Sequence, residues 1–487
     1  MTYTVEYLQQ ILNELRKLPK ETEWVEFKHN NADPDEIGEQ ISALSNSAAL
    51  VGKTRAYLVW GIESSTHNIL GTNFKPKSKK IGNEELESWL LRLLTPKINF
   101  SFYEINTEQG GVILLEIERA FRHPVQFKGV EYVRIGSYTK PLKAFPEKER
   151  QLWRIFDTTP FEDLFAIDNI DADAVLRLLD YPAYFDMLKQ PLPDNKQGIL
   201  NRLIEDNMVR KNDAGLYGIT NLGAILIAKK LDDFKDIKRK AVRVIVYENA
   251  TRIKTIKEQV SIKGYASGFE GLIDFISGLI PRNEVIGKAL RKDVPMYPII
   301  AVRELIANAL IHQDFFIRGA GPMVEIFLDR IEITNPGVPL VKTERFLDSP
   351  PKSRNEALAS FMRRVGVCEE RGTGIDKAVF ETELYQLPAP LFEIVEDNTR
   401  ATLFAHRPLS KMDRKDRVRA TYLHACLKYV QRGYLTNSSL RERFGIQKEN
   451  SSMVSRIIKE ALEDKAIKFP DPESESRKYA RYIPFWA

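Results

Sequence analysis

Cysteine is scarce in this chain, which has 487 residues but only Cys368 and Cys426. Two thiols are too few for a disulfide framework or a thiolate metal site. Long apolar runs are also missing, and none approaches the length of about 20 residues that a membrane helix needs. The N-terminus lacks the basic stretch and apolar run of a secretory signal. These absences predict a cytoplasmic protein without a membrane partner.

Net charge is small, at +5, but it is unevenly distributed. Residues 411–487 contain 17 Lys and Arg against 10 Asp and Glu, a net charge of +7, which leaves −2 for the rest of the chain. A basic C-terminal region indicates affinity for an anionic polymer such as nucleic acid. The alternative is a helix surface whose charges face only water.

The length exceeds what one hydrophobic core supports, so several domains are expected. Strands alternate with helices over about the first 145 residues, a helical stretch follows, and a second α/β block precedes a polar linker. We predict a multi-domain α/β (α+β) protein with domains at 1–148, 149–235, 236–408 and 409–487.

One short motif, Gly52-Lys53-Thr54, suggests a phosphate-binding P-loop. The P-loop pattern also requires a glycine at position 47, which is Ser47. A helix precedes the motif and a strand follows it, so no helix N-terminus is available for a phosphate. A tight turn after the helix is therefore predicted, and the absent Walker motif argues against a helicase.

The stretch "ETEWVEFKHN" carries Glu21, Glu26 and Lys28. Its "VEFK" alternates as a strand does, which places Glu26 and Lys28 on one face. The next strand, "YLVWGIE", ends at Glu63. Converging carboxylates stay ionised most easily around a divalent cation, and a lysine beside them can stabilise a phosphate. Metal-dependent phosphodiester cleavage needs this combination, and the alternative is a strand whose charges face water.

These motifs, with the Gly of "NILG", resemble the Schlafen-type AlbA_2 domain, also called the divergent AAA_4 domain, over about residues 5–145. The resemblance implies a metal-dependent nuclease for structured RNA such as tRNA, with a role in phage defence or stress. It implies Mg or Mn ligands at Glu21, Glu26 and Glu63, with Lys28 as the motif lysine. This chain departs from the family in the turn after Asn46, where "ALVGK" replaces a Gly-Gly pair.

A second motif, "VRELIANALIHQDFF", places Glu304 and Asn308 one helical turn apart. An amide oxygen can bind the metal of a Mg-nucleotide, and a carboxylate can polarise a water molecule. "VEIFLDRIEITNPG" then predicts a strand pair that ends in a tight turn. In "RRVGVCEERGTGI", the run 372–374 can cradle phosphate with backbone N–H groups. The alternative is a chance pair on a helix.

This order resembles the GHKL (Bergerat) ATP-binding fold, in the variant found in RecG-related proteins, over about residues 296–406. The resemblance implies that Glu304 is the hydrolytic glutamate and that Asn308 binds the metal. It implies further nucleotide contacts at Asp314, Asn335, Gly337, Arg354, Asn355, Gly372, Thr373 and Gly374.

The tail reads as helix, turn, helix and strand, which is typical of a winged helix. Thr436 or Asn437 should cap its first helix and Gly445 should end it, and Ser451 or Ser452 should cap the second. The expected core stripe of the second helix is Met453, Ile457, Ile458 and Leu462. The expected nucleic-acid contacts are Arg456, Lys459, Arg477, Lys478 and Arg481. The alternative is a winged helix used only for protein contacts.

Taken together, these motifs predict an ATP-binding, metal-dependent endoribonuclease, a GHKL-type ATPase, or both, acting as a homo-oligomer on RNA, with tRNA as the expected substrate. The alternative function is an ATP-responsive DNA-binding transcriptional regulator without nuclease activity. Convergence of the three glutamates discriminates between the two.

Overall fold

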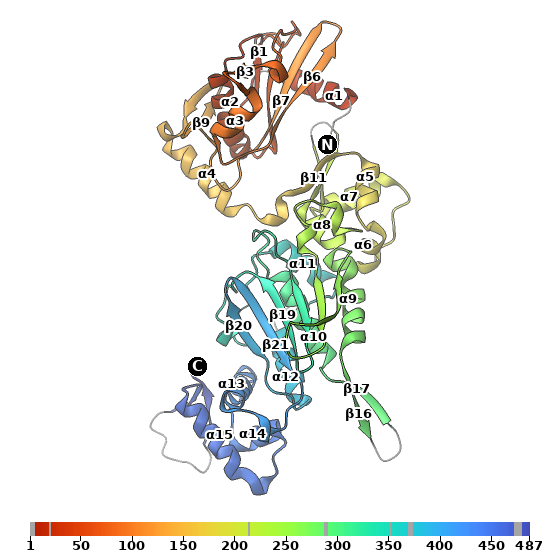
Figure 1. The fold of residues 1–487 in the computed structure, drawn as a ribbon, viewed down its shortest axis with the longest axis vertical. Coiled ribbons are helices and arrows are strands. Elements are labelled where there is room, and N and C mark those ends of the chain that lie inside the picture. The colour runs from red at the N-terminus through yellow and green to blue at the C-terminus, as the bar shows by residue number, and fades with distance from the viewer. Residues whose placement is uncertain are drawn as a thin grey trace. The chain divides into compact units, whose positions relative to one another are not determined.

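A computed structural model describes residues 5–18, 21–212, 215–286, 291–350, 352–368, 374–471 and 480–487. The chain divides into two compact units, which are described separately below. The first covers residues 1–159, and the second covers residues 160–212 and 216–487. Both units mix helices with sheets (Figure 1), which confirms the predicted α/β class. The finer division into four domains stays a prediction.

The first unit contains two four-stranded sheets. In one sheet, with the order β1-β2-β7-β6, β1 and β2 are parallel and the other neighbours are antiparallel. Its strands are β1 (Val25–Lys28), β2 (Arg55–Trp60), β7 (Gly110–Glu118) and β6 (Phe100–Thr107). The second sheet has the order β10-β9-β8-β5, and its strands are β10 (Tyr138–Pro141), β9 (Val130–Ile135), β8 (Gln126–Phe127) and β5 (Leu94–Thr95). A short hairpin of β3 (Lys80–Ile81) and β4 (Glu84–Glu85) adds to the unit.

Helix α2 (Pro34–Leu50) contacts both sheets, through β2 and β9. Asp33 caps its N-terminus, and the buried Asn46 side chain bonds to the backbone of Val125 and Tyr132. After the helix, Gly52 has a φ of 72°, in the left-handed region that favours glycine. The predicted tight turn at "GKT" is therefore confirmed. The other helices of this unit are α1 (Val5–Arg16), α3 (Leu86–Leu93) and α4 (Pro146–Thr158).

The second unit is built around a six-stranded sheet with the order β15-β14-β18-β19-β21-β20. Its strands are β15 (Thr255–Val260), β14 (Arg243–Tyr247), β18 (Met323–Ile326), β19 (Arg330–Pro336), β21 (Asn398–Phe404) and β20 (Leu391–Val395). The antiparallel pair β18 and β19 is the strand pair predicted from "VEIFLDRIEITNPG". Helix α10 (Ile299–Ile311) packs against β19 and against α12 (Gly374–Leu384).

Further elements of the second unit surround this sheet. Its N-terminal part contains a three-stranded sheet, β11-β13-β12, and a separate hairpin joins β16 to β17. These strands are β11 (Phe165–Ile170), β12 (Val209–Lys211), β13 (Tyr217–Thr220), β16 (Arg282–Ile286) and β17 (Arg291–Pro295). The helices are α5 (Ala172–Leu178), α6 (Tyr181–Met187), α7 (Lys196–Glu205), α8 (Asn221–Ile227), α9 (Tyr265–Leu279) and α11 (Glu356–Arg364).

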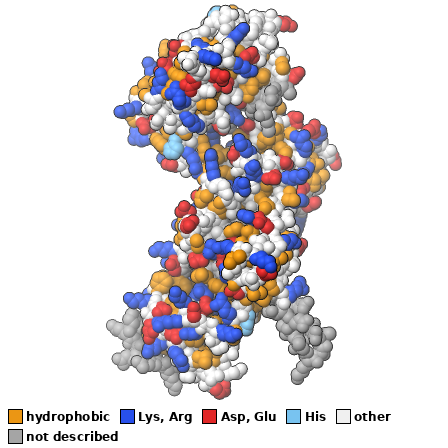
Figure 2. Space-filling view, in the orientation of Figure 1, with side chains coloured by type: hydrophobic (Ala, Val, Ile, Leu, Met, Phe, Trp, Pro, Cys, Tyr) orange, Lys and Arg blue, Asp and Glu red, His pale blue; other side chains and the backbone are white. Residues whose placement is uncertain are grey.

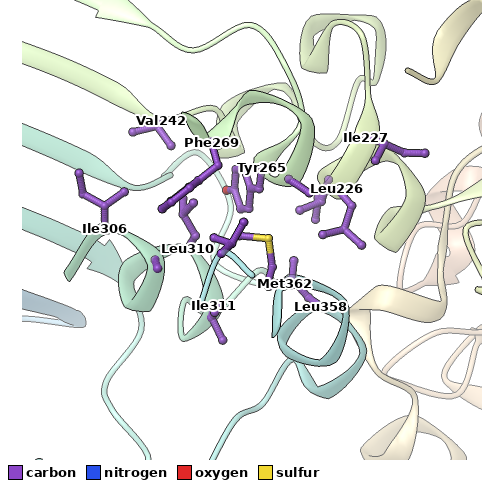
Figure 3. Packing of buried hydrophobic residues seen from close by; sticks show 14 of the residues in the cluster. Leu226, Ile227, Val242, Tyr265, Phe269, Ile306, Leu310, Ile311, Leu358 and Met362 are labelled. Atoms are coloured by element: carbon purple, nitrogen blue, oxygen red, sulfur yellow. The ribbon is translucent and has the colours of Figure 1, made fainter. Parts of the chain in front are cut away.

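The hydrophobic core of the second unit joins α8, α9, α10 and α11 (Figure 3). Phe269 of α9, Leu310 of α10 and Met362 of α11 all belong to this cluster and are at most 1% exposed. A close-packed interior transmits displacement because it has few voids to absorb it. Glu304 lies on α10, and Arg354 lies two residues before α11. The packing of these two helices therefore holds both residues in place.

The C-terminal segment contains α13 (Arg414–Val430), α14 (Asn437–Phe444), α15 (Ser451–Glu463) and the short pair β22 (Ile467–Lys468) and β23 (Ile483–Pro484). A capping box at Thr436 and a left-handed Gly445 bound α14, as predicted. Two details differ from the prediction. Asn450 occupies the N-cap of α15, and Met453 is exposed while Val454 is buried. The winged-helix assignment itself stays a prediction.

On the face shown in Figure 2, Lys and Arg side chains are interspersed with Asp and Glu side chains. None of the helices within the described ranges combines the length and the apolar character needed to cross a membrane.

Candidate functional site

Strand β1 holds Glu26 and Lys28 on one face, as its alternation predicts, while Val25 and Phe27 are buried. The Lys28 Nζ lies 3.2 Å from Glu26 Oε1. Glu26 is only 5% exposed, so the alternative of a strand whose charges face water is wrong for this residue. A buried carboxylate needs a partner, because the loss of water would otherwise cost several kcal/mol.

Arg134 supplies that partner from β9. Its guanidinium is fully buried and places Nη2 2.5 Å from Glu26 Oε2. The Oε1 atom of Gln40, on α2, accepts a hydrogen bond from Arg134 Nη1 at 3.2 Å. Glu26 is therefore neutralised on both oxygens, by Lys28 on one side and Arg134 on the other. Arg134 could not be predicted as a site residue, because nothing in "EYVRIGSY" distinguishes it from an exposed arginine.

Glu21 lies beside Glu26, as predicted. Its Oε1 accepts a hydrogen bond from the backbone N–H of Phe27 at 3.1 Å. Burial raises the pKa of Glu21, and the negative charge of Glu26 raises it further. The hydrogen bond from Phe27 and the charge of Arg134 oppose this rise in the pKa. The structure thus brings Glu21, Glu26 and Lys28 together.

Glu63 follows β2 and accepts a hydrogen bond from the Thr66 hydroxyl. The chain folds back here, since the Glu63 N–H donates to Asn68 and its C=O accepts from His67. Among the described residues, no group of three or more His, Cys, Asp or Glu side chains is arranged to hold a metal ion. The described side chains in this arrangement therefore do not form the three-carboxylate metal site that the resemblance implied.

The second unit contains a cavity of about 1100 Å³. Its walls come from five segments: α10, β19, the loop before α11 together with α11 itself, the start of α12, and the sheet edge at β20 and β21. Five of the residues predicted for the nucleotide site line this cavity: Glu304, Asn308, Asn335, Arg354 and Gly374. These residues are up to 70 positions apart in the sequence, so the fold has assembled them.

Glu304 and Asn308 face the N-terminus of α12. A Cβ atom on Gly374 would lie 2.6 Å from Glu304 Oε2 and 3.4 Å from Asn308 Nδ2. A larger residue at this point would force the Glu304 carboxylate to shift. The Asn308 Nδ2 atom is buried and has no hydrogen-bond partner among the described residues. A buried donor that faces a cavity is suited to a polar ligand.

A second contact joins Asp314, Gly337 and Arg354. Gly337 has a φ of 105°, and a Cβ atom there would lie 2.5 Å from Arg354 Nη1 and 2.8 Å from Asp314 Cβ. The Arg354 Nη1 lies 3.8 Å from Asp314 Oδ2, and its Nη2 donates to the Val338 carbonyl at 2.8 Å. The first glycine turn therefore places the Arg354 guanidinium at the cavity wall.

Asn355, another predicted nucleotide contact, is described, whereas two further predicted contacts are not. Asn355 is buried and donates to the carbonyls of Ile311 and Gln313, at 2.7 and 2.8 Å, so its amide fixes the end of α10. Gly372 and Thr373 lie outside the described residues.

The lining of the cavity suits a nucleotide with its phosphates. Apolar side chains that suit a base include Ile333, Leu340, Phe346 and Phe392. Cationic side chains outnumber anionic ones on its walls, with Lys352, Arg354, Arg363 and Arg364 against Glu304 and Glu356. Together with the buried Asn308 Nδ2 donor, this set fits a nucleotide with its phosphates.

Two further ionisable residues of the second unit have environments that could not be predicted from the sequence. Burial lowers the pKa of His312 to about 4, with a further lowering from Arg354, so this cavity residue is neutral near pH 7. Lys240 is buried, and its Nζ donates to the carbonyls of Ile317 and Ala320 at 2.5 and 3.2 Å. It thereby fixes the loop that follows Asp314. A buried lysine has no sequence signal, because lysine is almost always exposed.

The predicted basic contacts of the tail are only partly described. Arg456 and Lys459 are exposed on α15, and Lys459 lies 3.9 Å from Glu463. The Arg481 guanidinium lies over the Tyr434 ring at 5.2 Å. Arg477 and Lys478 fall outside the described residues.

Comparisons with known proteins give one family match in each of the two units. Residues 21–143 match the family model described as "Schlafen, AlbA_2", and residues 319–403 match the one described as "Putative ATP-dependent DNA helicase recG C-terminal". No curated protein matches the chain. A crystal structure of the DIP2311 protein from Corynebacterium diphtheriae is similar at 16% identity and a TM-score of 0.43, covering 98% of this chain and 97% of that one. The two family matches confirm the predicted combination of a Schlafen AlbA_2 region with an ATPase-like region.

Proposed function

We propose that this protein binds ATP with a divalent cation in the cavity of the second unit, and that it acts on nucleic acid. The observation that carries the proposal is the assembly of Glu304, Asn308, Asn335, Arg354 and Gly374 around one cavity. The match of residues 319–403 to an ATPase-like family supports the same ligand. Asn308 would hold the cation, and Glu304 would orient a water molecule if ATP is hydrolysed.

For the first unit, the proposed activity is cleavage of RNA, with tRNA as the substrate class and ATP as the controlling ligand. The support is the contact between Glu21, Glu26 and Lys28, together with the match to the Schlafen family. A lysine beside two carboxylates can stabilise a phosphate while a carboxylate moves a proton. The proposed role in phage defence or stress rests on the family resemblance.

An experiment on cleavage should use Glu21→Gln rather than a change at Glu26. Removing the Glu26 carboxylate would leave the Arg134 guanidinium buried without its partner, and the protein would then lose stability. Glu21→Gln keeps an acceptor for the Phe27 N–H. The protein and this variant would be incubated with total tRNA and with plasmid DNA, with Mg, Mn or EDTA, and with or without ATP.

The expected result is tRNA cutting by the wild-type chain, with a loss of at least about 100-fold in Glu21→Gln. The lanes with EDTA decide whether the activity requires a metal. Equal cutting by both proteins would contradict the assignment of Glu21. An absence of cutting in every lane would favour the second candidate function.

The second candidate is an ATP-responsive DNA-binding regulator. It is favoured by the exposed Arg456 and Lys459 on α15, whose helix follows α14 as the second helix of a DNA-binding winged helix does. Arg456→Ala with Lys459→Ala would then weaken the binding of duplex DNA. Unchanged affinity for DNA in this double variant would count against the regulator.

A further inference from the structure

Four lysines fall within six residues of the first unit, at Lys75, Lys77, Lys79 and Lys80. We call residues 75–80 the basic segment. A short 3₁₀ turn, Pro76–Ser78, and the start of β3 form its backbone. Lys75, Lys77 and Lys80 are exposed. Like charges at this spacing repel one another unless an anion lies between them.

The basic segment is anchored to the core of the unit. Phe74, directly before it, is buried against Trp60, with ring centroids 4.8 Å apart, and Pro76 is buried as well. The Lys79 Nζ donates to the Ala32 carbonyl at 2.5 Å. A solvated lysine tail would have no such anchors. The positive charges are therefore held at fixed positions, which lowers the entropic cost of binding an anion.

The basic segment also lies next to the strand end that carries the acidic residues. Asn30 is two residues beyond Lys28, the last residue of β1. The Asn30 Oδ1 accepts hydrogen bonds from Thr72 Oγ1 at 2.9 Å and from the Asn73 N–H at 3.1 Å. A depression of about 550 Å³ lies between Asn30 and the basic segment, and Asn30, Asn73, Lys75, Ser78 and Lys79 line it.

Resting on the proposed nucleic-acid function of the first unit, we propose that this depression and the basic segment bind the phosphate backbone of RNA and lead it to the end of β1. The lysines supply charge, and the amides of Asn30 and Asn73 and the Ser78 hydroxyl supply hydrogen bonds to phosphate or ribose. The lining contains no acidic side chain. Contacts of this kind position the polymer without reading its sequence.

Not all four lysines are equally free for this role. Lys80 is the register partner of Glu85 in the β3–β4 pair, so it belongs to the hairpin and not to the depression. Lys79 is committed to the Ala32 carbonyl. Lys75 and Lys77 are therefore the two charges that a test should remove.

The test measures binding of fluorescently labelled tRNA to the full chain by anisotropy, at several salt concentrations. The variant is Lys75→Gln with Lys77→Gln, and the control is Lys143→Gln with Lys148→Gln, which removes the same charge from another part of the first unit. The expected result is about tenfold weaker binding in the variant, and a salt slope smaller by about 1.5, because each lost phosphate contact lowers the slope by about 0.7 to 0.9. The control should bind as the wild type does.

The outcomes separate this inference from the proposed function. Binding by the wild type with an unchanged affinity and salt slope in the Lys75 and Lys77 variant would overturn the inference and leave the nucleic-acid function intact. Failure of the wild type to bind tRNA or plasmid DNA would overturn both. A loss confined to duplex DNA would also overturn the assignment to RNA. An unchanged thermal midpoint and ATP affinity would show that the variant is folded.

Discussion

The carboxylate of Glu304 lies against the backbone of Gly374, where a Cβ atom would be only 2.6 Å from Oε2. The two residues come from different helices, α10 and α12, and both line the proposed ATP cavity. The position of the Glu304 carboxylate therefore depends on the absence of a side chain at residue 374.

Gly374→Ala should displace the Glu304 carboxylate and weaken ATP binding about tenfold, which corresponds to about 1.4 kcal/mol. Isothermal titration with Mg-ATP would measure the change. Gly271→Ala is a matched control, because Gly271 is exposed on α9 and a Cβ there meets nothing within 4 Å. Equal affinities for ATP in the two variants would contradict a role for this contact.

Arg134→Ala should destabilise the chain by about 3 to 5 kcal/mol, because it leaves the Glu26 carboxylate buried without its arginine. Urea denaturation would measure the free energy of unfolding. The control is Arg92→Ala, which breaks the exposed pair with Glu84 at 2.8 Å and should cost much less stability, because water screens that pair. Similar losses of stability in both variants would show that the buried Arg134–Glu26 pair contributes no more than an exposed pair.

His312 should make stability depend on pH. Its pKa is about 4 in the folded chain, mainly because of burial, against 6.5 as its ordinary value. Between these two values the unfolded chain binds the extra proton and the folded chain does not, so the free energy of unfolding falls as pH drops from about 6.5 to about 4. The loss is on the order of 3 kcal/mol.

His312→Gln should remove this part of the pH dependence. The measurement is urea denaturation of both proteins at about pH 4.5 and about pH 7.5. The difference between the two pH values should shrink in the variant. If the free energy of unfolding changes equally between the two pH values in both proteins, His312 does not contribute to the pH dependence.

Glu162 connects the start of the second unit with the cavity wall. Its buried carboxylate accepts hydrogen bonds from the backbone N–H groups of Ala357 and Leu358, in the first turn of α11. Glu162→Ala should cost about 1 to 2 kcal/mol of stability, as the loss of a helix cap does. It should also weaken ATP binding, since α11 carries Arg363 and Arg364 at the cavity.

Thermal unfolding and Mg-ATP titration would test this prediction together. Asp233→Ala is the control, because Asp233 is an exposed acid in the same unit. An unchanged ATP affinity in Glu162→Ala, at temperatures where the variant is folded, would show that Glu162 stabilises α11 without affecting ATP binding.

Local features of this chain could be predicted from its sequence because they depend on neighbouring residues. The helical spacing of Glu304 and Asn308, the caps at Thr436 and Gly445, and the turn at Gly52 all follow from short-range rules.

The long-range partners could not be predicted in this way. Arg134 meets Glu26 across 108 positions, and Glu162 meets Leu358 across 196. Such pairs arise from the packing of whole elements, which periodicity does not specify. Glu63 was predicted to converge with Glu26 because it follows the end of a strand. In the structure, the carboxylate of Glu63 instead accepts a hydrogen bond from Thr66, in the turn after β2.

The most direct test of the central claim is a titration of Mg-ATP into the full chain and into Asn308→Ala. We expect the wild type to bind one ATP per chain and the variant to bind at least about tenfold more weakly, because the buried Asn308 amide lines the cavity. Binding of ATP with equal affinity by both proteins, or no binding by the wild type, would contradict it.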